Sequence, residues 1–190
     1  MKRKAKIAII VEGAKTEPQI FNSINELFFS QYDIVSFVLP TCTNIYGVWK
    51  YVKDDEVDII EAIKELIAKQ NTLKHKDRLL SKLGEYRRND FSEIYLFYDL
   101  DAHHNLRHTE RNEVGMDILS LMFAYFDNET EHGKLYISYP MVEAIKHFFS
   151  LKHCDNGTCF YPINDGKQFK KFVSNNTCIN DFKKLDLNLK

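Results

Sequence analysis

A continuous apolar run from Ile7 to Val11 ends directly in Glu12 and Gly13, and residues with helical spacing begin near Thr16. This order is typical of a buried strand, a tight turn and the start of a helix. Open α/β sheets place their chemistry at the carboxyl ends of their strands, so Glu12 is predicted to lie at a functional edge. Gly13 permits a close backbone approach that a side chain would block. An acid at this position, rather than a glycine-rich phosphate loop, favours metal-dependent chemistry over nucleotide binding.

The same pattern recurs later, where the apolar and aromatic run from Ile94 to Tyr98 ends in Asp99 and Asp101. Further strands are expected at 33–40 and 135–138, and helices from Thr16, over 56–70, within the basic stretch 73–92, after Asn112 and from Pro140 to 149. Residues 41–53 are expected to form a loop. Strands that alternate with helices predict an α/β fold, with a mainly parallel sheet of about four strands and helices on both faces.

Length and composition set the outer limits of this fold. The chain has 190 residues, of which 44% are hydrophobic, and this is ample for a core. We expect a main domain over 1–150 and a C-terminal extension over 151–190 that packs on it. The net charge is −1, so any nucleic-acid binding must use a local patch. No apolar run approaches the roughly 20 residues of a membrane span, and the amino-terminal segment leads straight into a strand, so no membrane association and a cytoplasmic location are expected.

The carboxylates at the strand ends suggest a metal site. Side chains alternate along a strand, so Asp99 and Asp101 project to the same side. Two close carboxylates repel each other unless one is protonated or a cation lies between them. Mg²⁺ or Mn²⁺ prefers oxygen ligands and leaves coordination positions for a phosphate. Glu12 could complete the metal shell or move a proton, and Glu143 and Glu17, each in the first turn of an expected helix, could reach the same pocket.

The string VEGAKTE, followed by DLD at the end of an apolar strand, resembles the toprim domain of topoisomerases, primases and small nucleases. It is most similar to the stand-alone and OLD-type toprim nucleases, including the RloB-like proteins of bacterial phage-defence systems. The resemblance covers roughly residues 5 to 150. It implies a toprim-like, Rossmann-like fold and Mg²⁺- or Mn²⁺-dependent phosphodiester cleavage. In that case Glu12 is the general acid or base, Asp99 and Asp101 hold the metal, and Glu143 is the later acid of the motif set.

The sequence departs from this family in two respects. OLD-type nucleases carry a second glutamate soon after the first, and Glu17 matches its spacing only loosely. They also carry an ATPase domain, whereas no GxxxxGK[ST] motif occurs here, so an ATPase would be a separate chain. The family also suggests a homodimer as one arrangement. A basic residue that assists the metal site in this group has only Lys167, Lys170 and Lys171 as candidates.

Several basic side chains are candidates for contact with nucleic-acid phosphates, because such contacts require positive charge but no sequence-specific geometry. They are Lys15, Lys76, Arg78, Lys82, Arg87, Arg88, His103, His104 and Arg107. A solvated amphipathic helix explains those within 74–88 equally well, and a surface loop explains those that follow Asp101. The sequence does not decide between DNA and RNA, and tRNA is among the substrates considered.

The expected function is therefore a metal-dependent nuclease, an effector of an anti-phage defence system. Glu12 could instead be an ordinary turn residue, and Glu143 could simply favour its helix amino terminus through the dipole. A partner-activated subunit without its own activity is one alternative function. A phosphatase of the HAD type is less favoured, because the expected nucleophilic aspartate near the first strand is absent. Zinc is disfavoured, because Cys154, Cys159 and Cys178 have irregular spacing.

Overall fold

The structure is a computed structural model. It describes residues 5–29, 34–41, 43–53, 57–71, 76–100 and 118–138, with isolated positions at Val142, Gln168, Lys171, Phe172 and Asn175. The helix expected from Pro140 to 149, apart from Val142, and nearly all of the extension over 151–190 lie outside this part of the chain. Within it, no helix is both long and apolar enough to cross a membrane.

A five-stranded sheet forms the centre of the fold, with the strand order β2-β1-β3-β5-β4. The strands are β1 (Ala5–Val11), β2 (Ile34–Pro40), β3 (Glu93–Asp99), β4 (Asp127–Asn128) and β5 (Gly133–Ser138). All neighbouring pairs are parallel except β4 with β5, which is antiparallel. The expected α/β class with a mainly parallel sheet is confirmed. The sheet has one strand more than predicted, because a two-residue strand is too short to leave a periodic signal.

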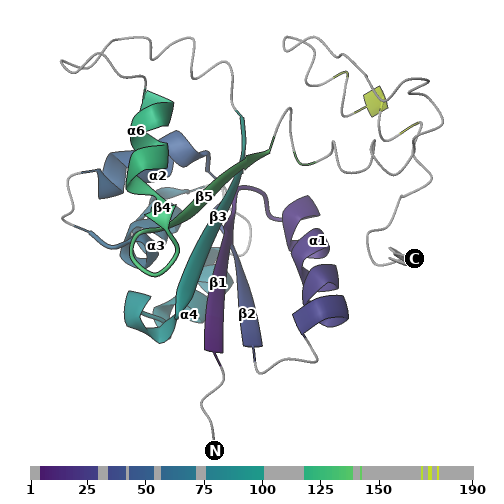
Figure 1. The fold of residues 1–190 in the computed structure, drawn as a ribbon, viewed down its shortest axis with the longest axis horizontal. Helices are drawn as coiled ribbons and strands as arrows, with labels where there is room; N and C mark the ends of the chain where they lie inside the picture. Colours follow the sequence, from purple (N-terminus) through teal and green to yellow (C-terminus); the bar gives the residue numbers. More distant parts are fainter. Residues whose placement is uncertain are drawn as a thin grey trace, which may run out of the picture.

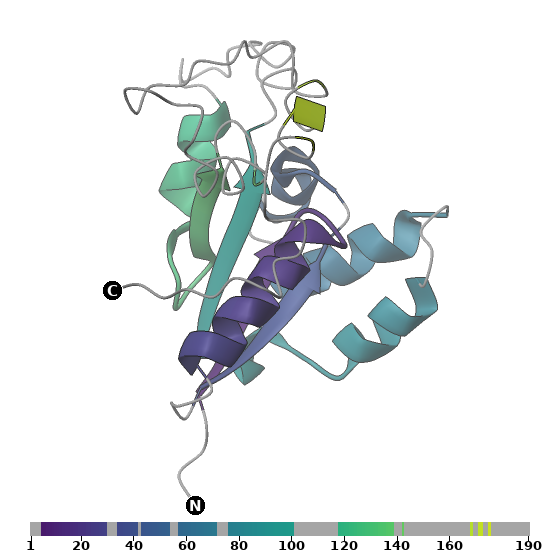
Figure 2. The ribbon, with the colours of Figure 1, turned by 90° about the vertical axis from the view of Figure 1, so that its right-hand side faces the viewer.

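Helices cover both faces of the sheet (Figure 1). They are α1 (Thr16–Ile24), α2 (Ile45–Val52), α3 (Ile59–Lys69), α4 (Lys76–Gly84) and α6 (Ile118–Tyr125), with a π-helical turn at Asn25–Phe29 and a 3₁₀ turn at Arg88–Asp90. Helix α1 lies on one face, and α2, α3, α4 and α6 lie on the other. In the side view, α1 runs along the sheet near β2 (Figure 2). Helices α3 and α4 lie at the right of this view, on the other side of β2 from α1.

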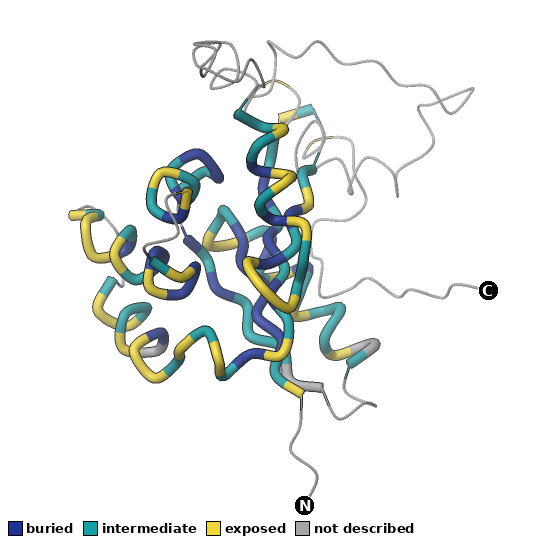
Figure 3. Tube along the Cα trace, turned by 60° about the vertical axis from the view of Figure 1, so that its left-hand side comes forward, coloured by how far each residue is buried: buried dark blue, intermediate teal, exposed yellow. Residues whose placement is uncertain are grey.

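The strict alternation of side chains divides the core into two parts. On the face of the four helices, Ala8 and Ile10 of β1 and Ile94 and Leu96 of β3 belong to one large cluster of buried residues. On the face of α1, a smaller cluster is formed by Ile7, Ile9 and Val11 of β1, against which Phe21 of α1 packs. The inward sides of the four helices are buried and their outer sides exposed, as amphipathic helices require (Figure 3).

The loop expected at 41–53 is wrong for most of its length, because α2 occupies Ile45–Val52. Gly47 and the aromatic residues of this segment lower its intrinsic helix propensity. Burial outweighs that cost, since Ile45, Val48 and Val52 lie at helical spacing and are each at most 1% exposed. Asn44 caps the helix by accepting a hydrogen bond from the Gly47 N–H at 3.0 Å.

Gly133 begins β5 in a conformation that favours glycine, with φ of +105°. A Cβ atom there would lie 2.5 Å from Cδ1 of Leu96, a fully buried side chain. We expect Gly133→Ala to lower the free energy of unfolding by about 1–3 kcal/mol, because strain and overpacking add.

Gly84, the last residue of α4, is the matched control for this substitution. A Cβ there meets nothing within 4 Å, so Gly84→Ala should be neutral or stabilising by up to about 1 kcal/mol. Urea unfolding of both variants measures the difference. Equal stability of the two would contradict the assignment of strain to Gly133.

Candidate functional site

The parallel pairing of β1 with β3 brings Glu12 next to Asp99. Val11 and Phe97 are partners in the register, so Glu12, one residue after Val11, and Asp99, two residues after Phe97, lie at the ends of adjacent strands. The Asp99 N–H donates to Oε2 of Glu12 at 3.4 Å, a long contact for a hydrogen bond. Both residues are partly exposed. Two acids separated by 87 positions in the sequence thus meet at the carboxyl ends of adjacent strands, which we call the carboxyl edge.

The carboxyl edge between β1 and β3 is a topological switch point. After β1 the chain enters α1 on one face of the sheet, whereas α6, which follows β3 in the element order, packs on the other face. In open α/β sheets the segments that leave in opposite directions create a crevice at this place, and ligands bind there. Glu12 and Asp99 lie at the strand ends that border it.

The Asp99 carboxylate is oriented by a backbone amide. Its Oδ1 accepts a hydrogen bond from the Val142 N–H at 2.7 Å, which ties the end of β3 to the segment after β5. The β3–β5 ladder also continues past Asp99, since the Leu100 N–H donates to the Ser138 carbonyl at 3.0 Å. Val142 leaves no signal in the sequence, because its role depends on its backbone N–H, which every residue except proline possesses.

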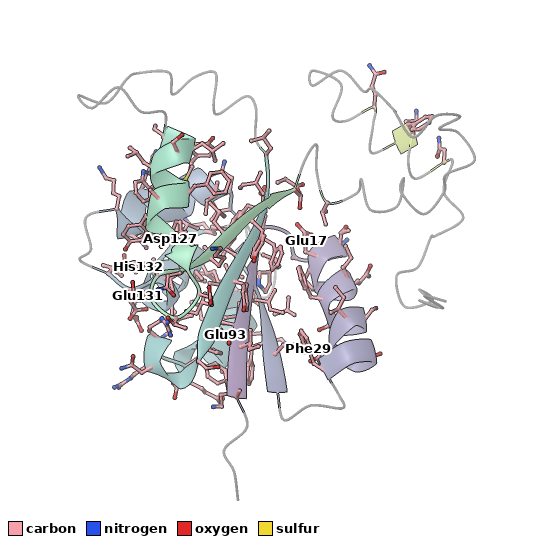
Figure 4. The ribbon with its side chains drawn as sticks, in the orientation of Figure 1. Glu17, Phe29, Glu93, Asp127, Glu131 and His132 are labelled. Atoms are coloured by element: carbon pink, nitrogen blue, oxygen red, sulfur yellow. The ribbon has the colours of Figure 1, made fainter. Side chains whose placement is uncertain are left out.

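Glu17 is turned toward the same edge but is held by the backbone. It is only 8% exposed, and its Oε1 accepts a hydrogen bond from the Gly13 N–H at 3.0 Å. A Cβ on Gly13 would lie 2.5 Å from Oε2 of Glu17, so the glycine is what allows this approach. Figure 4 places Glu17 at the end of α1 nearest the carboxyl edge. Its contact is that of an acid that closes the turn after β1; its ligation of a metal stays a prediction.

The described residues among those predicted to bind nucleic acid are divided between two places. Lys15 is exposed and precedes α1, next to the Gly13 turn. Helix α4 instead lies toward the amino ends of the strands (Figure 1). There the Lys76 Nζ donates to the Ala68 carbonyl, and Arg78 and Arg87 are exposed. The Lys82 side chain is outside the described structure.

The Arg88 side chain is bonded to backbone carbonyls, which indicates a structural role. Its guanidinium donates to the carbonyls of Phe91 at 2.9 Å and Glu131 at 2.8 Å, and also to that of Thr130. Burial lowers the pKa of Arg88, although Asp58 counteracts this effect. These bonds join the 3₁₀ turn to the segment between β4 and β5. The guanidinium is therefore already engaged by protein groups.

The remaining predicted site residues lie outside the described part of the chain: Asp101, Glu143, His103, His104 and Arg107. Among the residues that are described, no group of three or more histidine, cysteine, aspartate or glutamate side chains could hold a metal ion. The described contribution to the site is therefore the pair Glu12 and Asp99. The available donors there are carboxylate oxygens, which fit a hard divalent cation.

A separate small pocket lies beside the β4–β5 turn, at the amino end of β5, whereas Glu12 and Asp99 lie at the carboxyl edge. It has a volume of about 40 Å³ and is lined by Val52, Asp58, Ile59, Arg88, Tyr125, Phe126, Glu131 and His132. This volume admits a few water molecules but no nucleotide. Figure 4 shows His132 and Glu131 in this region, near Asp127.

Comparisons of this chain with models of known families, with curated proteins and with solved structures found no match.

The contact between Gly13 and Glu17 predicts a coupled pair of substitutions. Gly13→Ala should lower the free energy of unfolding by about 1–2 kcal/mol, because the added methyl displaces the Glu17 carboxylate and breaks its hydrogen bond. In a Glu17→Ala background the same change should cost much less, because the space is then empty. A double-mutant cycle from urea unfolding measures this coupling. Additive effects of the two changes would contradict the described contact.

The surroundings of Arg88 predict a loss of stability. Arg88→Lys should lower the free energy of unfolding by about 1–3 kcal/mol, because an ammonium group cannot reach the carbonyls that the planar guanidinium bridges. Arg87→Lys, at the exposed neighbouring position, should change it by less than about 0.5 kcal/mol. Thermal and urea unfolding distinguish the two. A neutral Arg88→Lys would argue against this structural role.

Proposed function

We propose that this protein is a metal-dependent nuclease that cleaves phosphodiester bonds in DNA or RNA. The observation that supports this most directly is the meeting of Glu12 and Asp99 at the carboxyl edge, with the Asp99 N–H 3.4 Å from Oε2 of Glu12. A site built on these two acids requires this proximity, because one acid without the other offers neither a cation site nor a proton-transfer group beside one. The toprim resemblance supplies the substrate class.

The donor set suits Mg²⁺ or Mn²⁺. Glu12 and Asp99 would hold the ion, and both acids are partly exposed, as a site that admits a phosphate requires. The 2.7 Å bond from the Val142 N–H leaves Asp99 with one oxygen fixed by the backbone and its carboxylate plane oriented. Glu143 is the next residue in the sequence after Val142, which supports its expected place at the same edge. Asp101 would add a carboxylate on the side of β3 that Asp99 occupies.

When bound, the ion would offset negative charge on the phosphate and acidify a coordinated water. The residues of the chain would do the rest. Asp99 would orient the phosphate through the ion while its own position is fixed by Val142. Glu12, one strand away, would move a proton to or from the reacting oxygen. Lys15, exposed beside the turn after Glu12, would contact an adjacent phosphate.

Basic residues on α4 would contribute differently. This helix lies toward the opposite end of the strands, so its lysine and arginine side chains would bind only a substrate that extends around the sheet. Their loss should weaken binding and its salt dependence more than the chemical step. The defence role, a separate ATPase and a homodimer remain expectations from the resemblance.

The experiment uses isosteric changes at the two acids. Glu12→Gln and Asp99→Asn keep acceptors for the Asp99 and Val142 amides but remove the charge. Each should reduce Mn²⁺-dependent cleavage of plasmid, single-stranded DNA or tRNA at least about 100-fold, because both metal binding and proton transfer depend on the carboxylates. Circular dichroism and urea unfolding should show a retained fold.

Glu93→Gln is the matched control, because Glu93 lies on the same strand as Asp99 but at its other end (Figure 4). Its activity should equal that of the unaltered protein. Cleavage that persists in both acid variants would refute the proposed function, as would equal loss in the control.

A further inference from the structure

Thr41 is a buried polar residue at the carboxyl end of β2, the strand next to β1. It follows β2, it is 0% exposed, and its N–H donates to the Val11 carbonyl at 2.8 Å. Its Oγ1 lies 3.1 Å from the same carbonyl and 3.0 Å from the Thr43 carbonyl, so the single hydroxyl proton serves one of them at a time. The Thr41 carbonyl in turn accepts from Nε2 of Gln70, next to α3, at 3.2 Å.

The same hydroxyl group is bonded from the other side by Tyr98. This residue of β3 is 1% exposed, and its Oη donates to Oγ1 of Thr41 at 3.1 Å. The bond connects positions 57 apart in the sequence, across the strand that separates β2 from β3. A fully buried link between two hydroxyl groups is costly to leave incomplete, which makes the geometry specific.

Two of the residues bound by Thr41, Val11 and Tyr98, immediately precede an acid of the site. The Val11 carbonyl belongs to the peptide group that joins Val11 to Glu12, and Tyr98 is followed by Asp99. Val11 is paired with Pro40 in the parallel register, so its carbonyl accepts the ladder bond from the next residue, through the Thr41 N–H. The Thr41 hydroxyl adds a side-chain contact to the same carbonyl and links it to Tyr98 of β3. One side chain therefore fixes the ends of β1 and β3 relative to each other.

We propose that Thr41 is a positioning residue, which uses Tyr98 and the Val11 carbonyl to set the separation of Glu12 and Asp99. Its effect on ion binding rests on the proposed function, whereas its effect on the strand ends does not. Groups behind metal ligands commonly control affinity by orienting the ligands, and their loss weakens binding by about 10-fold to 100-fold. Thr41 itself touches neither substrate nor ion.

The test compares Thr41→Val, which removes the hydroxyl at nearly constant volume, with Thr41→Ser, which keeps it. Calorimetric titration with Mn²⁺ alone should give a dissociation constant about 10-fold higher for Thr41→Val and close to that of the unaltered protein for Thr41→Ser. In the metal-free protein, hydrogen exchange at the Gly13 and Asp99 amides should be about 5-fold to 10-fold faster in Thr41→Val, the change expected for one lost hydrogen bond.

Two further variants separate positioning from stability. Ile63→Val, a fully buried change in α3, destabilises the core but alters none of the hydrogen bonds of Thr41, so Mn²⁺ affinity should not change. The double variant Thr41→Val/Tyr98→Phe removes both hydroxyl groups and should regain stability relative to Thr41→Val, since neither partner is left in an apolar site. Its Mn²⁺ affinity should stay low. Affinity that returns together with stability would overturn the proposal.

Failure of the proposed function gives a different result. If the unaltered protein binds no Mn²⁺, the nuclease assignment is refuted, and the metal-free exchange experiment alone decides the role of Thr41. Unchanged exchange at Gly13 and Asp99 in Thr41→Val, with Ile94 and Leu96 amides as internal references, would overturn the positioning role. Faster exchange at the two strand ends, restored by serine, would support it.

Discussion

The parallel pairing of β1 with β3 is the constraint on which the candidate site depends. Its register sets Val11 opposite Phe97, so Glu12 and Asp99, one and two residues further along, lie within reach of each other. A shift of one residue would exchange the two faces of a strand and move its apolar side chains from the core to the opposite face. The burial of Ile94 and Leu96 therefore fixes the register, and through it the meeting of Glu12 with Asp99.

The two faces of β3 differ in how they are covered. Toward the four helices, Ile94, Leu96 and Tyr98 are at most 1% exposed. On the other face Phe97 stacks on Tyr136 of β5 with the ring planes 11° apart, and Tyr136 remains 44% exposed. The strand that carries Asp99 is thus anchored mainly from one side. A rigid strand anchored in a core is a more precise support for a reacting group than a loop.

Backbone amides have a large part in the polar contacts around the acids. Glu17 accepts from the Gly13 N–H, Glu12 accepts from the Asp99 N–H, and Asp99 accepts from the Val142 N–H. Asp99 ends β3, Gly13 comes two residues after β1, and Val142 follows β5, so each contact satisfies a backbone donor at or beyond the end of a strand. The carboxylates thus serve the fold as well as any chemistry. Removing a charge while keeping its oxygen acceptor separates the two roles.

The sequence by itself determined the elements and their kind. Apolar runs that end in acids marked β1 and β3, and the stripe of Ile59, Ile63 and Ile67 marked α3, because burial imposes a period on the sequence. Helix α2 and the short β4 escaped detection. Their local signals were weak, and packing against the rest of the sheet compensates for that weakness.

Only the tertiary structure decided which of these residues meet. The strand order, the register of β1 with β3, the bond from the Val142 amide and the buried link between Thr41 and Tyr98 all join segments that are distant in the sequence. Periodicity reports which side of an element is buried, but not what lies against it. The local sequence predicted that Glu12 and Asp99 are acids at strand ends, whereas their proximity depends on the free energy of the assembled core.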